Sequence, residues 1–176
     1  MTEKKLFDNL FKVIKGNSGA LSANDGVFTE IFDLQIPRGY AARIRKIVWE
    51  PQINTEQLDQ EYFRMLGACV LDPDDETSVA IPTFTVDHDV CADYSFEMVR
   101  YEEDTTPNGI SVGYTRRETI DFDEGLDVVT VRNIRVNTMI TGSAAGGSAQ
   151  AQLRAAVYFT YEKVSADLYS KLLGIS

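Results

Sequence analysis

The stretch that decides the fold runs from Leu126 to Val164 and reads LDVVTVRNIRVNTMITGSAAGGSAQAQLRAAVYFTYEKV. It holds two long runs in which nearly every second residue is apolar or β-branched. In the first run these positions are Val128, Thr130, Arg132, Ile134, Val136, Thr138 and Ile140. In the second run they are Leu153, Ala155, Val157, Phe159 and Tyr161. Alternation of this length predicts antiparallel strands with one face on a hydrophobic core.

The connection between the two runs, residues 142–149, contains only glycine, serine and alanine. Such a segment predicts a flexible connection, with its turn at Gly146-Gly147. We therefore expect the last two strands to lie close together and to close a β-sandwich as a long terminal pair.

The rest of the chain contains more strand-like runs and no alternation of strands with long helices. These runs lie at 28–36, 41–50, 62–71, 79–86, 95–101 and 110–122. Pro82 makes 79–86 an edge strand or an extended loop, and Pro37-Arg38-Gly39-Tyr40 predicts a turn. The fold class that follows is all-β, an antiparallel β-sandwich, with a jelly roll of about eight strands as the leading version.

The N-terminal segment is expected to be an amphipathic helix. Its apolar residues recur at helical spacing, and lysines flank them. The residues with a predicted role in assembly are Leu6, Phe7, Leu10, Phe11 and Ile14 together with Lys4, Lys5, Lys12 and Lys15. A helix of three turns is too short to be stable alone in water, so it docks on its own domain, on a neighbouring subunit or on a lipid surface.

A second short helix is expected at the C-terminus. Ser165 is placed to cap it, and Leu168 and Leu172 supply its apolar contacts, which we also assign to assembly. Residues 17–26 are small and polar and predict a linker. The chain then divides into 1–26, an assembly arm of helix and linker, and 27–176, a single jelly-roll domain with a short C-terminal helix.

Composition narrows the classes of function. The chain has 176 residues and a formal net charge of −10. The negative charge argues against a protein whose main function is to bind nucleic acid phosphates. No apolar run is long enough to span a bilayer, and the lysine-containing N-terminus lacks the continuous apolar segment of a secretory signal. The basic residues Arg43, Arg45 and Lys46 form either an interaction patch or a solvated face.

Few residues suit catalysis or metal binding. The chain has one histidine, His88, whereas three-His zinc sites and two-His iron sites need more than one imidazole. No G-x-S-x-G elbow, Walker A loop or G-x-G-x-x-G motif is present. We therefore expect no enzyme, no cofactor and no small-molecule substrate.

Three features keep an alternative open. Asp87-His88-Asp89 forms either a surface cluster or part of a metal site shared between subunits. The acidic stretch 72–76 is a solvated turn or a Ca²⁺ site, although it lacks the EF-hand pattern. Cys69 and Cys91 lie in or beside apolar runs, which favours two reduced, buried thiols over a disulfide between neighbouring strands.

The order of these features resembles a family of viral coat proteins. An N-terminal amphipathic segment is followed by the strand and turn FTEIFDLQIPRGY at 28–40, and the chain ends in the long strand RAAVYFTYEKV at 154–164. This layout is similar to that of the single jelly-roll major capsid proteins of tailless icosahedral viruses of archaea and bacteria. One departure is that many single jelly-roll capsid proteins of small RNA and DNA viruses carry a long Arg/Lys-rich arm for the genome, whereas this chain has only four lysines there. This fits a shell that lies over a membrane, or one whose genome is neutralised by other proteins, better than direct packaging of the genome.

The resemblance implies a structural protein that self-assembles into an icosahedral shell. It implies that the chain is made in the host cytoplasm and resides in the virion. Its partners are then other copies of itself and other capsid proteins, with an internal membrane or the genome surface as further partners of the N-terminal helix. The terminal helices and the loops 102–109 and 142–149 become assembly elements.

Two other functions stay open. The first is a carbohydrate-binding or adhesive β-sandwich, in which Trp49 and tyrosines stack on sugar rings. The second is a carboxylate-dependent hydrolase, for which Asp121, Asp123, Glu124 and Asp127 form the densest cluster.

Overall fold

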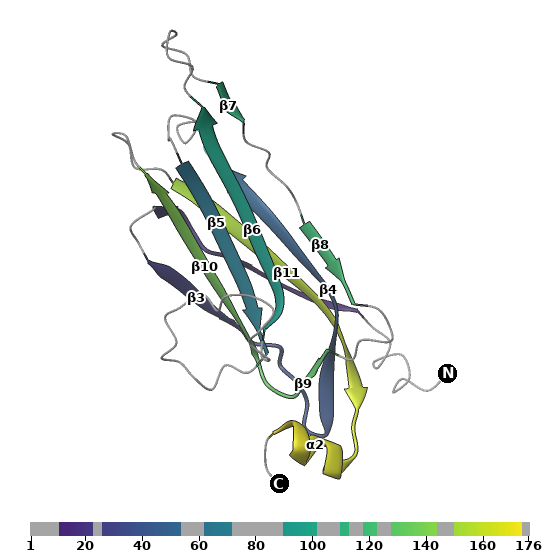
Figure 1. Ribbon diagram of the computed structural model, residues 1–176. Coiled ribbons are helices and arrows are strands. Elements are labelled where there is room, and N and C mark those ends of the chain that lie inside the picture. Colours follow the sequence, from purple (N-terminus) through teal and green to yellow (C-terminus); the bar gives the residue numbers. More distant parts are fainter. Residues whose placement is uncertain are drawn as a thin grey trace.

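A computed structural model of the chain describes residues 11–22, 26–53, 62–71, 90–101, 110–112, 118–122, 128–143 and 150–173. These residues form two antiparallel sheets that face each other, with one short helix at one end (Figure 1). Within this part of the chain, no helix is long and apolar enough to cross a membrane.

Two sheets, called sheet A and sheet B, make up the sandwich. Sheet A has the order β1 (Lys12–Asn17), β11 (Gln150–Lys163), β4 (Tyr40–Ile53), β8 (Glu118–Asp121), with β2 (Leu21–Ser22) beside β11 and β9 (Val129–Thr130) beside β4. Sheet B has the order β3 (Val27–Phe32), β10 (Ile134–Ser143), β5 (Tyr62–Val70), β6 (Val90–Tyr101), β7 (Ile110–Val112).

The connectivity of the eight main strands is that of a jelly roll. In chain order, the first strand pairs with the last, β1 with β11, and the second with the seventh, β3 with β10. The third pairs with the sixth, β4 with β8, and the fourth with the fifth, β5 with β6. This is the nested pairing of one long hairpin wound into two sheets, which confirms the predicted all-β jelly roll.

The core lies between the two sheets, and its largest fully buried side chain is Trp49. Trp49, on β4, is 0% exposed and packs on Tyr94 of β6, with ring centroids 6.1 Å apart. Gly67, on β5, makes room for it. A Cβ atom at Gly67 would lie 2.7 Å from Cδ2 of Leu153 and 3.0 Å from the Trp49 ring, so a larger residue there would push the two sheets apart.

The expected pairing of the last two strands is wrong. β10 belongs to sheet B, between β3 and β5, whereas β11 belongs to sheet A, between β1 and β4. The first run of the alternating stretch is also divided, because β9 pairs in sheet A before the chain crosses to sheet B. At this crossing the backbone N–H of Arg132 donates to the hydroxyl of Thr130 (3.0 Å). The turn predicted at Gly146-Gly147 lies outside the described residues.

The expected N-terminal helix is wrong for residues 12–17, which form β1. Lys12, Ile14 and Gly16 are half-buried on one side of this strand, while Val13 and Lys15 are exposed on the other. The same residues fit a helical and a strand spacing over so short a length. Pairing with β11 decides between the two, because a three-turn helix has little stability of its own. Within the predicted linker, Leu21 is buried and β2 pairs with β11.

Other local predictions are confirmed. The backbone N–H of Tyr40 donates to the carbonyl of Pro37 (3.0 Å), and Gly39 has a positive φ of 80°, as the predicted turn requires. The C-terminal helix α2 (Ala166–Leu172) begins after Ser165, whose hydroxyl accepts a hydrogen bond from the N–H of Leu168. The segment 79–86 lies outside the described residues.

Candidate assembly surfaces

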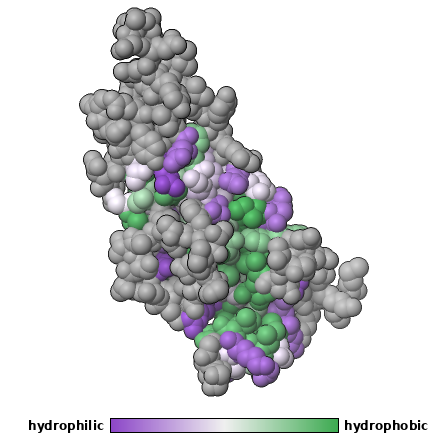
Figure 2. Space-filling view, viewed as in Figure 1, coloured by the Kyte–Doolittle hydropathy of each residue, from purple (hydrophilic) through white to green (hydrophobic). Residues whose placement is uncertain are grey.

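Large apolar side chains are exposed mainly along one side of the sandwich. Among the described residues, Phe11 is 69% exposed, Val13 47%, Ile31 46% and Leu168 45%. Val13 lies on β1 and Ile31 on β3, the edge strands of the two sheets, and Phe11 immediately precedes β1. These two edges meet, because the inner side of Gly16 lies against the side chains of Glu30 and Phe32. Figure 2 shows a further apolar area towards the α2 end of the molecule.

The structure separates the residues that the sequence groups into one amphipathic face. Lys4, Lys5, Leu6, Phe7 and Leu10 lie outside the described residues. Of the others, Ile14 packs against the core, whereas Lys15 points away from it. The ammonium group of Lys12 lies 5.0 Å from the ring centroid of Tyr161.

At the C-terminal end, Leu168 is exposed on α2 and Leu172 is half-buried. The guanidinium of Arg132 donates to the carbonyl of Leu173 (2.8 Å), which ties the end of the helix to the crossing between the sheets.

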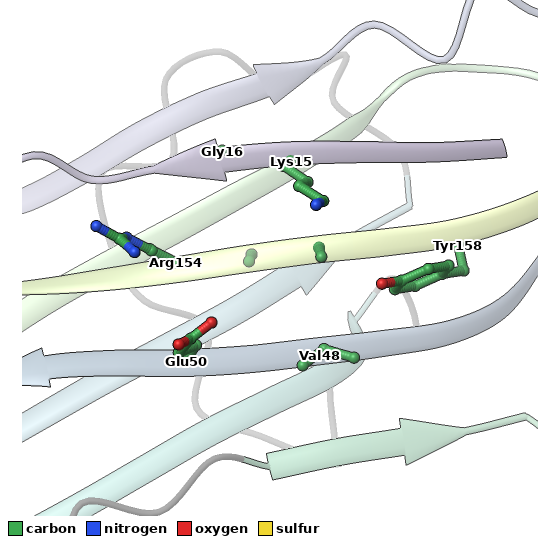
Figure 3. A pocket seen from close by; sticks show the side chains of 8 residues that line it. Lys15, Gly16, Val48, Glu50, Arg154 and Tyr158 are labelled. Atoms are coloured by element: carbon green, nitrogen blue, oxygen red, sulfur yellow. The ribbon is translucent and has the colours of Figure 1, made fainter.

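A hollow of about 220 Å³ lies on the outer face of sheet A, over β1, β11 and β4. Its lining includes four polar side chains, Lys15, Glu50, Arg154 and Tyr158 (Figure 3). The guanidinium of Arg154 also donates to the side chain of Gln52 (2.9 Å). The sequence did not reveal this site, because its residues come from three strands whose register only the fold supplies.

Ion pairs join neighbouring strands elsewhere on this outer face. The carboxylate of Glu162 forms ion pairs with the guanidinium groups of Arg43 (N–O distance 2.9 Å) and Arg45 (3.3 Å). Lys46 pairs with Asp121 of β8 at 3.1 Å. The three basic residues singled out in the sequence therefore face carboxylates on neighbouring strands, where exposed pairs contribute little stability each.

The edge of the sandwich opposite β1, near β8 and β6, carries acidic residues. Asp93 of β6 and Glu118 of β8 lie close enough to influence each other, and burial together with the charge of Glu118 raises the pKa of Asp93. No ion pair within the described part of the chain involves either carboxylate. With Asp121, this side carries three acidic residues where the β1 side carries Lys12 and Lys15.

Both cysteines are free thiols, as favoured from the sequence. Cys69 is buried on β5. The thiol of Cys91, on β6, donates a hydrogen bond to the backbone carbonyl of Cys69 (3.4 Å). Burial raises the pKa of Cys91 to about 12 and that of Cys69 well above its usual value. Both thiols are therefore protonated at neutral pH and poorly reactive.

The residues of the alternative functions are distributed as follows. Trp49 is in the core, which rules it out as the sugar-stacking residue of the carbohydrate-binding alternative. Asp121 is ion-paired, and Asp123, Glu124 and Asp127 lie outside the described residues, as do His88 and the acidic stretch 72–76. The residues that the structure describes contain no group of three or more histidine, cysteine or acidic side chains suited to a metal ion.

No protein-family model matches the sequence, and no curated protein matches it. Among solved structures, VP1 of the Trichodysplasia spinulosa-associated polyomavirus in complex with 3'-sialyllactose has a TM-score of 0.49 and 10% identity, over 87% of this chain and 94% of that chain. The 60-mer BFDV capsid protein has a TM-score of 0.34 and 9% identity, over 88% and 91%. Infectious bursal disease virus, Gx strain, has a TM-score of 0.31 and 11% identity, over 90% and 38%. The jelly-roll assignment of this chain comes from its own strand pairing.

Proposed function

We propose that the chain is a structural protein of a viral capsid, which assembles with copies of itself into an icosahedral shell. The observation that supports this most is the complete nested pairing of a jelly roll together with exposed Phe11, Val13 and Ile31 along one edge. Such a body is rigid, and exposed apolar groups on its edge strands are surfaces that neighbouring copies cover.

The finer parts of this proposal concern the virus and the location. The layout of the chain favours a tailless virus of archaea or bacteria, and the chain is then made in the host cytoplasm and resides in the virion. Other capsid proteins are the expected partners, and residues 1–26 contribute to assembly. The lysines of residues 1–16 are the candidate contact with an internal membrane or with the genome surface.

Electron microscopy of the purified full-length protein tests the shell function, with light scattering across protein concentration, salt and pH. We expect closed particles or capsomers. The variant V13S/I31S, which alters two exposed side chains and leaves the core intact, is expected to need a higher protein concentration for assembly. L168S tests the contribution of α2 in the same way. A wild-type protein that stays monomeric under all these conditions contradicts the proposal.

A second candidate function is supported by the hollow on sheet A. The hollow has the ring of Tyr158 at one end and the charged groups of Lys15, Glu50 and Arg154 further along it (Figure 3), a combination of aromatic surface and polar groups that binds sugars. Binding of the protein to a glycan array would support this function if Y158A abolished it and the control K163A kept it. Lys163 is exposed and lies outside the hollow. The absence of binding to any glycan would reject it.

A further inference from the structure

Among the residues that the structure describes, sheet A ends in strand β1 on one side and strand β8 on the other. Within the described part of the chain, β1 pairs only with β11 at one end, and β8 pairs only with β4 at the other. An edge strand has a row of backbone N–H and C=O groups on the side that has no neighbouring strand. A strand of another molecule can add to such an edge by main-chain hydrogen bonds.

The directions of the strands allow the two edges to pair with each other. All neighbours in sheet A are antiparallel, so β1 runs in the same direction as β4, and β8 runs in the same direction as β11. β8 and β1 therefore run in opposite directions. A second copy placed beside β8 in the same orientation presents its β1 antiparallel to β8, and the alternation of directions continues from one molecule to the next.

The side chains of the two edges also match. On each strand, half-buried residues on the core side alternate with exposed residues on the outer side. Placing Lys15 opposite Asp121 puts both charged groups on the outer side. The same register puts Ile14 opposite Phe122 and Gly16 opposite Ile120 on the core side, where Ile14, Ile120 and Phe122 are apolar and only partly buried.

Charge favours this pairing over the symmetric ones. β1 carries Lys12 and Lys15 and no carboxylate, whereas β8 carries Glu118 and Asp121 and no basic residue. Two β1 edges would bring lysines together, and two β8 edges would bring carboxylates together. Like charges opposite each other disfavour a strand pair, so only the head-to-tail arrangement joins opposite charges.

We propose that sheet A continues between molecules, with β1 of one copy added to β8 of the next and Lys15 opposite Asp121 in that contact. A head-to-tail contact of this kind generates rings when the rotation between copies closes. This inference rests on the proposed self-assembly and specifies the surface that it uses. Lys15 then has a role in the contact between copies as well as lining the hollow.

Charge reversal tests the pairing. K15E and D121K each place like charges at the contact, so the protein concentration needed for assembly should rise on the order of tenfold or more. Mixing the two variants in equal amounts should restore assembly, because every contact between unlike copies then joins a lysine to a carboxylate. K163E and E97K are the matched controls. Lys163 is an exposed lysine at the far end of β11, and Glu97 is ion-paired to Arg64 as Asp121 is to Lys46. Neither control should change assembly.

A cysteine cross-link tests the register. Asn17 and Thr119, both exposed, face each other in the proposed contact, so N17C/T119C should form a ladder of disulfide-linked oligomers under mild oxidation. The native thiols remain poorly reactive because their raised pKa values keep them protonated. N17C/E97C should form no ladder, and circular dichroism should show that every variant keeps the wild-type fold.

The outcomes separate this inference from the function on which it rests. Shells formed equally well by K15E and D121K, with no ladder in N17C/T119C, would overturn the edge contact and leave the capsid function standing. A ladder from a protein that never forms closed particles would support the edge contact and reject the shell. A monomeric wild type without a ladder would overturn both.

Discussion

Strands β10 and β11 have similar sequence patterns and different surroundings. On β11, the core-facing residues are buried, and the outward ones, such as Arg154 and Tyr158, are open to solvent to different degrees, with the exception of Thr160. On β10, the outward residues Arg135 and Asn137 are buried as well. A period-two pattern therefore reports which face of a strand meets the core. It does not report whether the other face is free to meet another molecule.

The largest expected effect separates the two faces of β11. Leu153 is buried against Gly67 and Trp49, so L153A should lower the free energy of unfolding by about 2–5 kcal/mol through lost burial and a remaining cavity. The neighbouring R154A, on the outer face, should change it by less than about 0.5 kcal/mol. Urea denaturation of both variants checks this contrast. Similar values for the two would show that the outer face of β11 is covered too.

A smaller effect compares two buried hydroxyl groups, one on the core-facing side of β10 and one on the outward side of β11. Thr138 on β10 and Thr160 on β11 are both buried. The Thr138 hydroxyl has no hydrogen-bond partner in the part of the chain that the structure describes, whereas that of Thr160 accepts from Arg45 Nε (3.4 Å). T138V should therefore raise the free energy of unfolding by about 1 kcal/mol, and T160V should lower it by a similar amount. Urea midpoints measured side by side test the difference in sign. Destabilisation by both substitutions would show that Thr138 has a partner.

The smallest effect concerns the acidic side, where sheet B meets sheet A at Asp93 and Glu118. A carboxyl group whose pKa is raised in the folded state favours the protonated form, so its charge opposes folding at neutral pH and this penalty disappears as pH falls through the raised pKa. D93N should raise the free energy of unfolding at pH 7 by about 0.5 kcal/mol, and the gain should vanish in acid.

Thermal unfolding of D93N and E118Q across pH, in dilute monomeric protein, measures this effect. E118Q removes the repulsion from the other side and should give a gain of the same sign. A loss of stability in either variant at pH 7 would show that a cation compensates these carboxylates.

Features that depend on residues close together in the sequence were predicted, whereas features that depend on distant residues were not. Turns and caps were predicted correctly, because Pro37, Gly39 and Ser165 act through bonds to residues a few positions away. The N-terminal helix was not, because Lys12–Asn17 lacks enough local preference to resist pairing with a strand more than a hundred residues later. The residues around the hollow were missed for the same reason, since each is an ordinary member of an alternating strand.

Alternation, turn residues and the scarcity of helical segments are local properties, so the sequence was enough to predict antiparallel strands with at least one face on the core. It also determined the acidic balance and the single histidine. The choice of neighbouring strands depends on the three-dimensional packing, because hydrogen bonds between strands form with any side chain, and register depends on how both sheets fill the space around Trp49. The positions of the open edges, and with them the pairing of Lys15 with Asp121 that we propose, follow from that arrangement.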